Sequence, residues 1–213
     1  MSPATAVGKR RRAPRGQGDR LREEILGAAE RLLVETGDEE AVSIRAMADA
    51  VGVTPPSIYL HFVDKNELMF AVCERQFARL DRVLEEAAAG SDDPLESLRL
   101  RGRAYVRFGL ENPEHYRILF MGNPGSDPKG FDAERVRTMA SFDHLVDAVV
   151  RCIDAGVIPR QDPVFVALGL WAVVHGITSL LISKPDLPWP DVETFADHLC
   201  GVQVTGLQGS PDG

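Results

Sequence analysis

A chain of 213 residues with 44% hydrophobic and 26% charged residues is long enough to bury one large or two small cores. This composition excludes wholesale disorder, and no stretch reaches the ~18 to 20 uninterrupted apolar residues needed to cross a bilayer, so we expect no membrane partner. The formal net charge is −8, yet seven basic residues and one acid lie between Lys9 and Arg22, so the acidic total does not exclude a nucleic-acid partner.

Residues 1–18 are rich in Ala, Pro, Gly and Arg, a composition that cannot bury enough apolar surface to order itself. We predict a disordered basic arm, which is either a solvated tail or an extension that follows the DNA backbone or enters the minor groove. From Asp19 to Thr36 apolar residues recur on one face of a predicted helix, and Gly37 ends that helix.

Two short helical patterns separated by a tight turn lie between Ser43 and Phe62. The first pattern has apolar residues at three-to-four spacing, and the hydroxyl of Ser43 suits its N-cap. Gly52 can take the positive φ that reverses the chain, and Thr54-Pro55 provides a second N-cap with proline at the first helical position. This order predicts a helix-turn-helix unit whose second helix has the size to enter the DNA major groove.

A longer pattern runs through the same segment: Ile44-Arg45-x-Met47-Ala48-x-x-x-Gly52-Val53-x-x-x-Ser57-Ile58-Tyr59-x-His61-Phe62, continuing into Lys65-x-x-Leu68. It resembles the DNA-binding segment of the TetR family of transcriptional regulators. The resemblance implies an all-helical homodimer with an N-terminal DNA-binding domain and a divergent C-terminal ligand-sensing domain. It also implies that a small molecule usually releases repression.

The exposed side chains of this unit are the candidate DNA site. In a helix-turn-helix the start of the second helix, Thr54 to Ser57, faces the base edges, where Pro55 and Pro56 offer only apolar contact, most usefully to a thymine methyl. The resemblance implies that Arg45 reaches the groove. It further implies phosphate contacts for Ser43, Tyr59, His61 and Lys65. The alternatives are packing or capping roles for the ring side chains and plain solvent exposure for the cations.

Asp64-Lys65-x-Glu67 opens a long predicted helix that joins the DNA-binding domain to the body, and residues 87–94 end it. Prolines and glycines then divide the body into further predicted helices at Leu95–Leu110, Glu114–Met121, Asp132–Asp154, Pro163–Ser183 and Val192–Leu207. No alternating pattern predicts a strand, so the expected fold class is all-α.

The expected domain organisation follows from these elements. An N-terminal three-helix helix-turn-helix domain, residues 19–66, precedes a C-terminal helical domain for ligand binding and dimerisation, residues 67–207. Residues 208–213 form a predicted disordered tail.

Aromatic and sulfur-containing side chains of the body form the candidate ligand site. Trp171 and His175 lie one turn apart on one helix face, and Gly176 permits close approach, a Trp-x-x-x-His-Gly pattern that resembles one branch of the family's C-terminal domains. A histidine and tyrosines in an apolar interior need hydrogen-bond partners. An apolar pocket with a few such polar groups is the usual form of a small-molecule site. The alternative is that these residues only pack in the core. The expected set is Tyr105, Phe108, Tyr116, Phe120, Met121, Phe142, Trp171 and His175.

Catalysis, cofactors and metals are not expected. The histidines are scattered, and the sequence contains no HExxH, nucleophile elbow or phosphate loop. The three cysteines lack the spacing of a zinc site or disulfide framework, and no signal-peptide pattern is present, so we expect a cytoplasmic protein.

Together with the resemblance, these observations predict a homodimeric regulator of a palindromic double-stranded DNA operator, a repressor released by an unknown small apolar or amphipathic effector. The alternatives are an activator, a corepressor-dependent regulator or, less favoured, a small-molecule or lipid-binding protein without DNA function. The most apolar stretch, Val164 to Ile182, is interpreted as a buried core helix. The expected dimer interface comprises Val164, Leu168, Val173, Leu180, Phe195, Leu199 and Val202.

Overall fold

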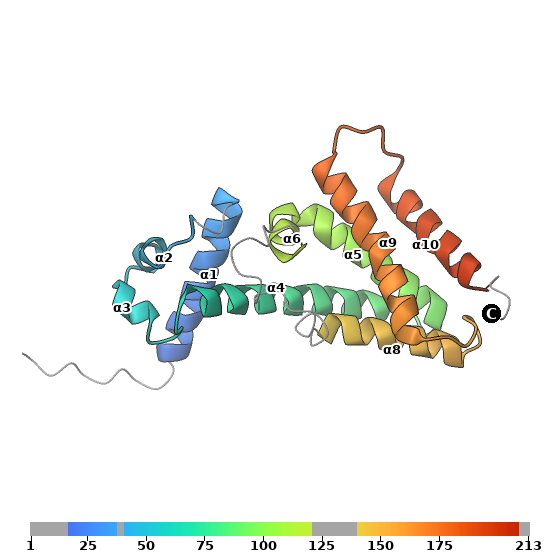
Figure 1. Cartoon of the computed structure of the whole chain (residues 1–213), viewed down its shortest axis with the longest axis horizontal. Helices are drawn as coiled ribbons and strands as arrows, with labels where there is room; N and C mark the ends of the chain where they lie inside the picture. The colour runs from blue at the N-terminus through green and yellow to red at the C-terminus, as the bar shows by residue number, and fades with distance from the viewer. Residues whose placement is uncertain (1–16, 38–40, 121–139, 209–213) are drawn as a thin grey trace, which may run out of the picture. The chain divides into compact units, whose positions relative to one another are not determined.

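The computed structural model describes residues 17–37, 41–120 and 140–208, and every regular element within these ranges is an α-helix. The predicted all-α class is therefore confirmed. The chain divides into two compact units, Met1–Val72 and Cys73–Gly213, and the division falls inside one continuous helix, α4 (Lys65–Ala88) (Figure 1). Most of the predicted basic arm, the last five residues of the predicted tail, Met121 and residues 132–139 lie outside the described residues.

The N-terminal unit contains α1 (Gln17–Thr36), α2 (Ile44–Val51) and α3 (Pro55–Ile58), with α1 packed on α2 and α2 on α3. Helix α1 begins at Gln17, so the last two residues of the predicted arm are helical. It ends at Thr36: the next residue, Gly37, still donates its N–H to the Leu33 carbonyl at 2.8 Å, and its φ of 63° then turns the chain out of the helix. The buried core of this unit comprises Ile25, Leu26, Ala28, Ala29, Leu33, Val42, Met47, Ala48, Ile58, Phe62, Leu68, Met69, Ala71 and Val72.

Helix α2 is closed at both ends as the sequence predicts. The Ser43 hydroxyl oxygen accepts a hydrogen bond from the Ala46 N–H at 3.1 Å, which makes Ser43 the N-cap. Gly52 has a φ of 73°, and the following Val53 N–H donates to the Ala48 carbonyl at 2.9 Å. These bonds use polar groups that a helix end otherwise leaves without partners, and they direct the chain into α3.

Thr54 is the N-cap of α3, with proline at the first helical position, as the sequence predicts. Thr54 has the extended backbone of an N-cap, but its side chain makes no hydrogen bond to the helix backbone. The reason is that Pro55 and Pro56 have no N–H, and the first available one, on Ser57, donates to the Thr54 carbonyl at 2.8 Å. The Thr54 hydroxyl instead lies 3.2 Å from the Ser57 hydroxyl.

The C-terminal unit is built around α5 (Pro94–Glu111), which packs against four other helices. These are α6 (Pro113–Phe120), α8 (Ala140–Asp154), α9 (Pro163–Ser183) and α10 (Val192–Gln208). Prolines at the first helical position follow capping aspartates: Asp93 accepts from the Glu96 N–H at 2.8 Å and Asp162 from the Val164 N–H at 2.9 Å. Helix α10 ends at Gln208, so the first residue of the predicted tail, residues 208–213, is helical.

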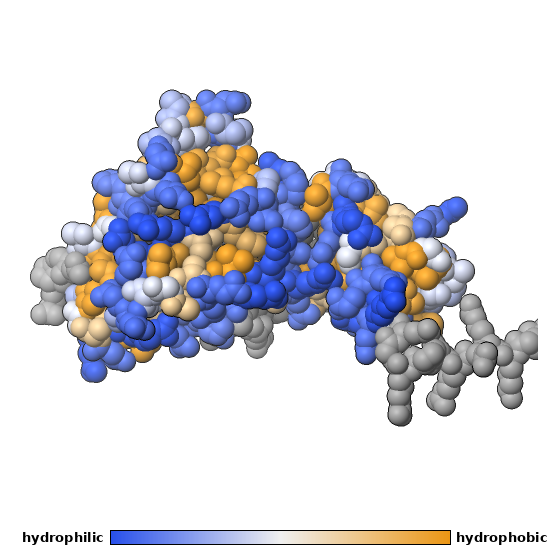
Figure 2. Space-filling view, turned by 180° about the vertical axis from the view of Figure 1, so that it is seen from behind, coloured by the Kyte–Doolittle hydropathy of each residue, from blue (hydrophilic) through white to orange (hydrophobic). Residues whose placement is uncertain are grey.

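Helix α9 contributes buried residues to the core, as interpreted from the sequence, but along one face only. It alone among the described helices has the length and apolar composition of a membrane span, and 39% of its most apolar window is buried. A single such helix is weak support for a membrane location, because core helices of soluble proteins share this composition. Its apolar residues exposed to solvent are Val164, Phe165, Leu168 and Leu180. In Figure 2, which shows the opposite side from Figure 1, further apolar surface lies below the projecting loop between α9 and α10.

Gly109 is expected to be required for the close approach of α5 to α9. A Cβ built on Gly109 lies 3.0 Å from Tyr116 Cδ2 and clashes with Thr178 Cγ2. A Gly109→Ala variant should therefore lose about 1 to 3 kcal/mol of unfolding free energy, the usual cost of overpacking a core. Gly206→Ala is the matched control, since nothing lies within 4 Å of its built Cβ. Thermal denaturation that gives equal midpoints for both variants would contradict this expectation.

Candidate functional site

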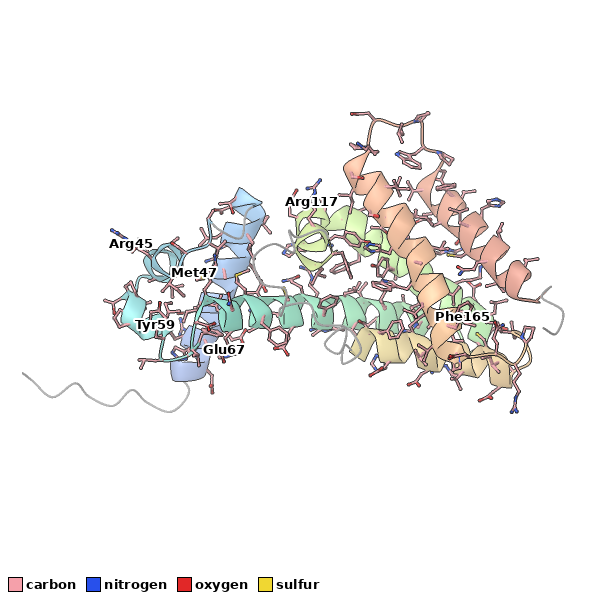
Figure 3. All side chains as sticks on the ribbon, in the orientation of Figure 1. Arg45, Met47, Tyr59, Glu67, Arg117 and Phe165 are labelled. Carbon is pink, nitrogen blue, oxygen red and sulfur yellow. The ribbon has the colours of Figure 1, made fainter. Side chains whose placement is uncertain are left out.

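The candidate DNA surface lies on α2 and α3 of the N-terminal unit. Arg45 is exposed and has no ion-pair partner among the described residues, and 54% of Tyr59 is exposed. Figure 3 shows Arg45 extending away from α2, while Met47 on the same helix is fully buried. Side chains that lie free at a helix-turn-helix are available to a duplex without unfolding any part of the core.

The predicted contacts at the start of α3 are accessible but chemically limited. Thr54, Pro55 and Pro56 are exposed and Ser57 is half-buried, and the two hydroxyls are neighbours of each other. Their rings and hydroxyls can contact methyl groups, bases or phosphates, but they carry no charge. The only cation that the structure places freely on this surface of α2 and α3, within the described ranges, is therefore Arg45.

The predicted phosphate-binding residues lie around these helices. The Ser43 oxygen accepts the Ala46 N–H, which leaves its own O–H to donate to a phosphate. His61 and Lys65 are half-buried, at the end of the α3 turn and the start of α4. Two apolar residues that sequence reasoning missed, Leu60 and Val63, are 82% and 81% exposed in the same segment. Their departure from the three-to-four apolar spacing was the available signal.

A cavity of about 270 Å³ lies inside the C-terminal unit, with walls from α4, α5, α6, α8, α9 and α10. This volume is near the lower end of small-molecule sites, which span ~300 to 1,000 Å³. The predicted residues that line it are Tyr105, Phe120, Phe142, Trp171 and His175. Tyr116 is fully buried next to this wall, and Phe108 lies in the surrounding core with the Arg79 guanidinium 5.8 Å from its ring centre; neither lines the cavity.

Four polar side chains form a hydrogen-bonded chain beside the cavity. Trp171 Nε1 donates to Tyr105 Oη at 3.2 Å, Tyr105 Oη lies 3.3 Å from Tyr116 Oη, and Tyr116 Oη lies 2.7 Å from His175 Nδ1. Both tyrosine hydroxyls are satisfied as donor and acceptor if Tyr105 donates to Tyr116 and Tyr116 donates to His175. In that arrangement His175 Nδ1 accepts, so its Nε2 carries the proton.

Burial keeps this chain neutral. It raises the pKa of Tyr105 to about 12, and it also raises the pKa of Tyr116. Burial lowers the pKa of His175, because the imidazolium form would lose its hydration. All three side chains are therefore uncharged near pH 7, and His175 lines the cavity as a neutral imidazole.

Two arginines of α5, Arg99 and Arg101, also line the cavity, and sequence reasoning missed them. Arg101 is 3% exposed, and its Nη1 donates to Glu85 of α4. Its Nε and Nη2 are buried and have no hydrogen-bond partner among the described residues. The available signal was its position four residues before Tyr105, on the same face of the helix.

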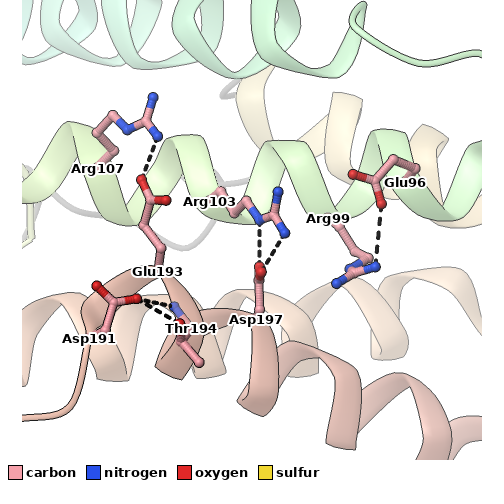
Figure 4. A network of polar contacts seen from close by, with 8 residues as sticks. All are labelled: Glu96, Arg99, Arg103, Arg107, Asp191, Glu193, Thr194 and Asp197. Carbon is pink, nitrogen blue, oxygen red and sulfur yellow. Dashed lines mark hydrogen bonds and ion pairs between the residues drawn. The ribbon is translucent and has the colours of Figure 1, made fainter.

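A neighbouring arginine shows how such a group is satisfied elsewhere in this chain. Arg103 donates from Nε to Asp197 Oδ1 at 2.6 Å and from Nη2 to Asp197 Oδ2, which joins α5 to α10 (Figure 4). This two-point bond lowers the pKa of the Asp197 carboxyl and raises the pKa of the Arg103 guanidinium. Arg107 and Glu193 form a second, exposed ion pair along the same two helices at 2.6 Å.

His144 on α8 is expected to make stability depend on pH. Its hydrogen bond from Nδ1 to Asp81 Oδ1, 2.9 Å long, raises the pKa of His144. The negative charge of Glu85 raises this pKa further, whereas the positive charge of Arg101 lowers it. A raised pKa stabilises the fold fully below the unfolded value of ~6.5, and the stabilisation is lost as pH rises through the folded value. Because His144 is 41% exposed, the contribution should be only ~0.2 to 1 kcal/mol. The melting difference between wild type and His144→Gln should therefore be larger at pH 6 than at pH 9; a pH-independent difference would contradict this.

The same cluster has the spacing of a metal site, with ligand atoms of Asp81, Glu85 and His144 within 4.8 Å of one another. The Arg101 guanidinium, however, already bonds to Glu85 and supplies positive charge there. The arrangement is therefore that of an ion-pair cluster between α4, α5 and α8.

Comparison with known proteins agrees with both units. Residues 25–72 match the family model described as "Bacterial regulatory proteins, tetR family", and residues 98–202 match that described as "Tetracyclin repressor-like, C-terminal domain". The HTH-type transcriptional activator FasR of Mycolicibacterium smegmatis is 30% identical over 167 residues, which cover 78% of this chain and 74% of FasR. The chain belongs to the TetR family. The resemblance inferred from residues 44–68 is thus confirmed.

Two further relatives of this TetR-family protein are informative. The HTH-type transcriptional regulator EthR of the same organism is 27% identical over 124 residues, covering 58% of this chain and 50% of EthR. A solved structure of a protein of unknown function from Rhodococcus sp. RHA1 has a TM-score of 0.75 at 27% identity, covering 88% of this chain and 95% of that one. Membership makes this TetR-family protein a DNA-binding transcriptional regulator with a helix-turn-helix domain and a helical C-terminal domain.

Proposed function

We propose that this protein is a cytoplasmic, homodimeric repressor that binds a palindromic operator and leaves it when a small amphipathic molecule occupies the C-terminal cavity. The observation that carries the proposal is the cavity itself, an apolar space lined by a neutral His175 and a buried Arg101. An apolar pocket with a few convergent polar groups is the usual form of a small-molecule site. No catalytic step is part of this function.

In the proposed complex the N-terminal unit, assigned to residues 19–66, holds the duplex. Arg45 and the segment Thr54 to Ser57 meet base edges, and the surrounding polar side chains fix the register on the backbone. The phosphate contacts are assigned to Ser43, Tyr59, His61 and Lys65. The exposure of Arg45 and Tyr59 supports this assignment.

The proposed dimer forms through α9 and α10. Val164, Leu168, Leu180 and Val202 are 44% to 55% exposed, and Phe165, at the start of α9 in Figure 3, is 71% exposed. Exposed apolar side chains of this size are unfavourable in water when they gather, and favourable in an interface. The other predicted interface residues, Val173, Phe195 and Leu199, are partly buried against the unit's own core. A symmetric pair also spans two half-sites about one helical turn, ~34 to 36 Å, or a multiple apart.

The ligand can change DNA binding only by the difference in its affinity for the DNA-bound and free forms. The test has two steps: selection of an operator from random duplexes, then titration of that complex with small molecules released from protein purified from its host. The expected result is a roughly 5- to 150-fold loss of operator affinity, the usual size of allosteric coupling. A compound that binds the C-terminal unit and leaves operator affinity unchanged would overturn ligand release.

An activator is the second candidate, because the relative FasR is named a transcriptional activator. In-vitro transcription from a template carrying the selected operator separates the two: a repressor lowers transcript yield, and an activator raises it. A ligand carrier without DNA function would enrich no sequence in the selection step.

A further inference from the structure

Arg101 is the most unusual charged group of the C-terminal unit. It is 3% exposed, lines the apolar cavity and bonds to Glu85 through Nη1. Its Nε and Nη2 atoms are buried without a hydrogen-bond partner among the described residues. Buried polar groups in folded proteins are nearly always satisfied, and leaving donors of a charged group unpaired is costly, so this pair of N–H groups calls for an acceptor.

The two unpaired nitrogens define the shape of that acceptor. Nε and Nη2 form one edge of the guanidinium, with parallel N–H groups that match the two oxygens of a carboxylate. Arg103, two residues along α5, uses these same two atoms to bind both oxygens of Asp197. The chain thus contains a built example of the bond that Arg101 lacks.

We propose that the ligand of the cavity is a carboxylic acid whose ionised carboxylate binds Nε and Nη2 of Arg101 while its apolar body lies against Leu80, Phe120 and Trp171. Both nitrogens are buried in the cavity wall, so binding requires a turn of the Arg101 side chain toward the cavity. This inference rests on the proposed function, since it names the ligand class of the same cavity. The carboxylate faces a guanidinium that Glu85 only partly neutralises, because the Glu85 side chain is 41% exposed to water. A neutral alcohol of the same length satisfies the cavity's apolar surface but leaves the Arg101 donors poorly paired.

The test compares three probes of equal chain length on the full-length protein: octanoate, 1-octanol and octylamine, with binding followed by calorimetry at pH 7.5. Octanoate is expected to bind roughly 10-fold or more tightly than 1-octanol, as hydrogen bonds between charged groups predict, and octylamine least tightly. Arg101→Met should remove the preference for octanoate. Arg107→Met is the matched control, because Arg107 lies on the same helix, is exposed and does not line the cavity.

A second variant keeps the test decisive if Arg101→Met does not fold. Glu85→Gln removes the competing negative charge and should strengthen octanoate binding roughly two- to fivefold, while 1-octanol binding stays the same. Equal affinities of wild type for octanoate and 1-octanol, or no response of octanoate to Glu85→Gln, would overturn the carboxylate assignment. Operator affinity measured with the same samples separates the two proposals: octanoate that binds through Arg101 without weakening the operator complex overturns ligand release and leaves this inference standing.

Discussion

Replacing Leu168 and Val202 together by glutamate is expected to convert the proposed dimer to a monomer and to weaken operator binding by roughly 100-fold or more. The two side chains are 46% and 55% exposed on α9 and α10. In the proposed dimer they are buried, so each glutamate would place a charge in an apolar interface. A monomer reaches one half-site at a time and loses the gain from simultaneous binding of two sites.

Sedimentation equilibrium and fluorescence anisotropy on the selected operator measure the two effects. Val150→Glu is the control, because Val150 is a partly exposed valine on α8, outside the proposed interface. It should leave both the mass in solution and the operator affinity close to wild type. A double variant that remains dimeric would show that the exposed face of α9 and α10 is not the interface.

Replacing Arg45 by alanine is expected to weaken operator binding by about 1 to 3 kcal/mol for each half-site, the worth of one good base contact. The effect on a dimer should therefore reach roughly 30-fold or more. Arg45 is the freely exposed cation of the α2–α3 surface, and the uncharged start of α3 has nothing that replaces its contact. The melting temperature should not change, since Arg45 contributes nothing to the core.

Anisotropy titrations with the selected operator and with a scrambled duplex measure this effect and its sequence dependence. Arg107→Ala serves as the matched control, an exposed arginine of the C-terminal unit. Loss of affinity confined to the selected operator means that Arg45 reads bases, whereas equal loss on both duplexes means that it binds phosphate. Unchanged affinity on both would remove Arg45 from the DNA site.

The helices were predictable because their ends carry local chemical signals. Proline at the first helical position, after Asp93 and Asp162, determines where α5 and α9 begin, and Gly52 determines where α2 ends, since each requires only neighbouring residues. Thr54 caps α3 through its backbone alone, also for a local reason: two prolines remove N–H groups that its hydroxyl would bind.

The cavity was only partly predictable, because residue type does not determine which way a side chain faces in a packed unit. Tyr105, Tyr116, Trp171 and His175 were expected in the ligand set, but the hydrogen bonds that link them join α5 and α6 to α9, which lies about 60 residues further along the chain. Arg101 was missed since arginine is usually exposed, as Arg107 is on the same helix. Only the packing of α5 against four helices determines that Arg101 is buried.

The paired prolines at the start of α3 have a consequence for how the protein tells duplexes apart. Many helix beginnings hold a phosphate with bare backbone amides, a contact that any sequence offers equally. Here Pro55 and Pro56 supply none, and the amide of Ser57 is occupied by Thr54. Anchoring to the sugar–phosphate chain must then come from flexible side chains, so weak, indiscriminate association with bulk chromosomal DNA should be more sensitive to added salt than in a relative with free amides at this turn.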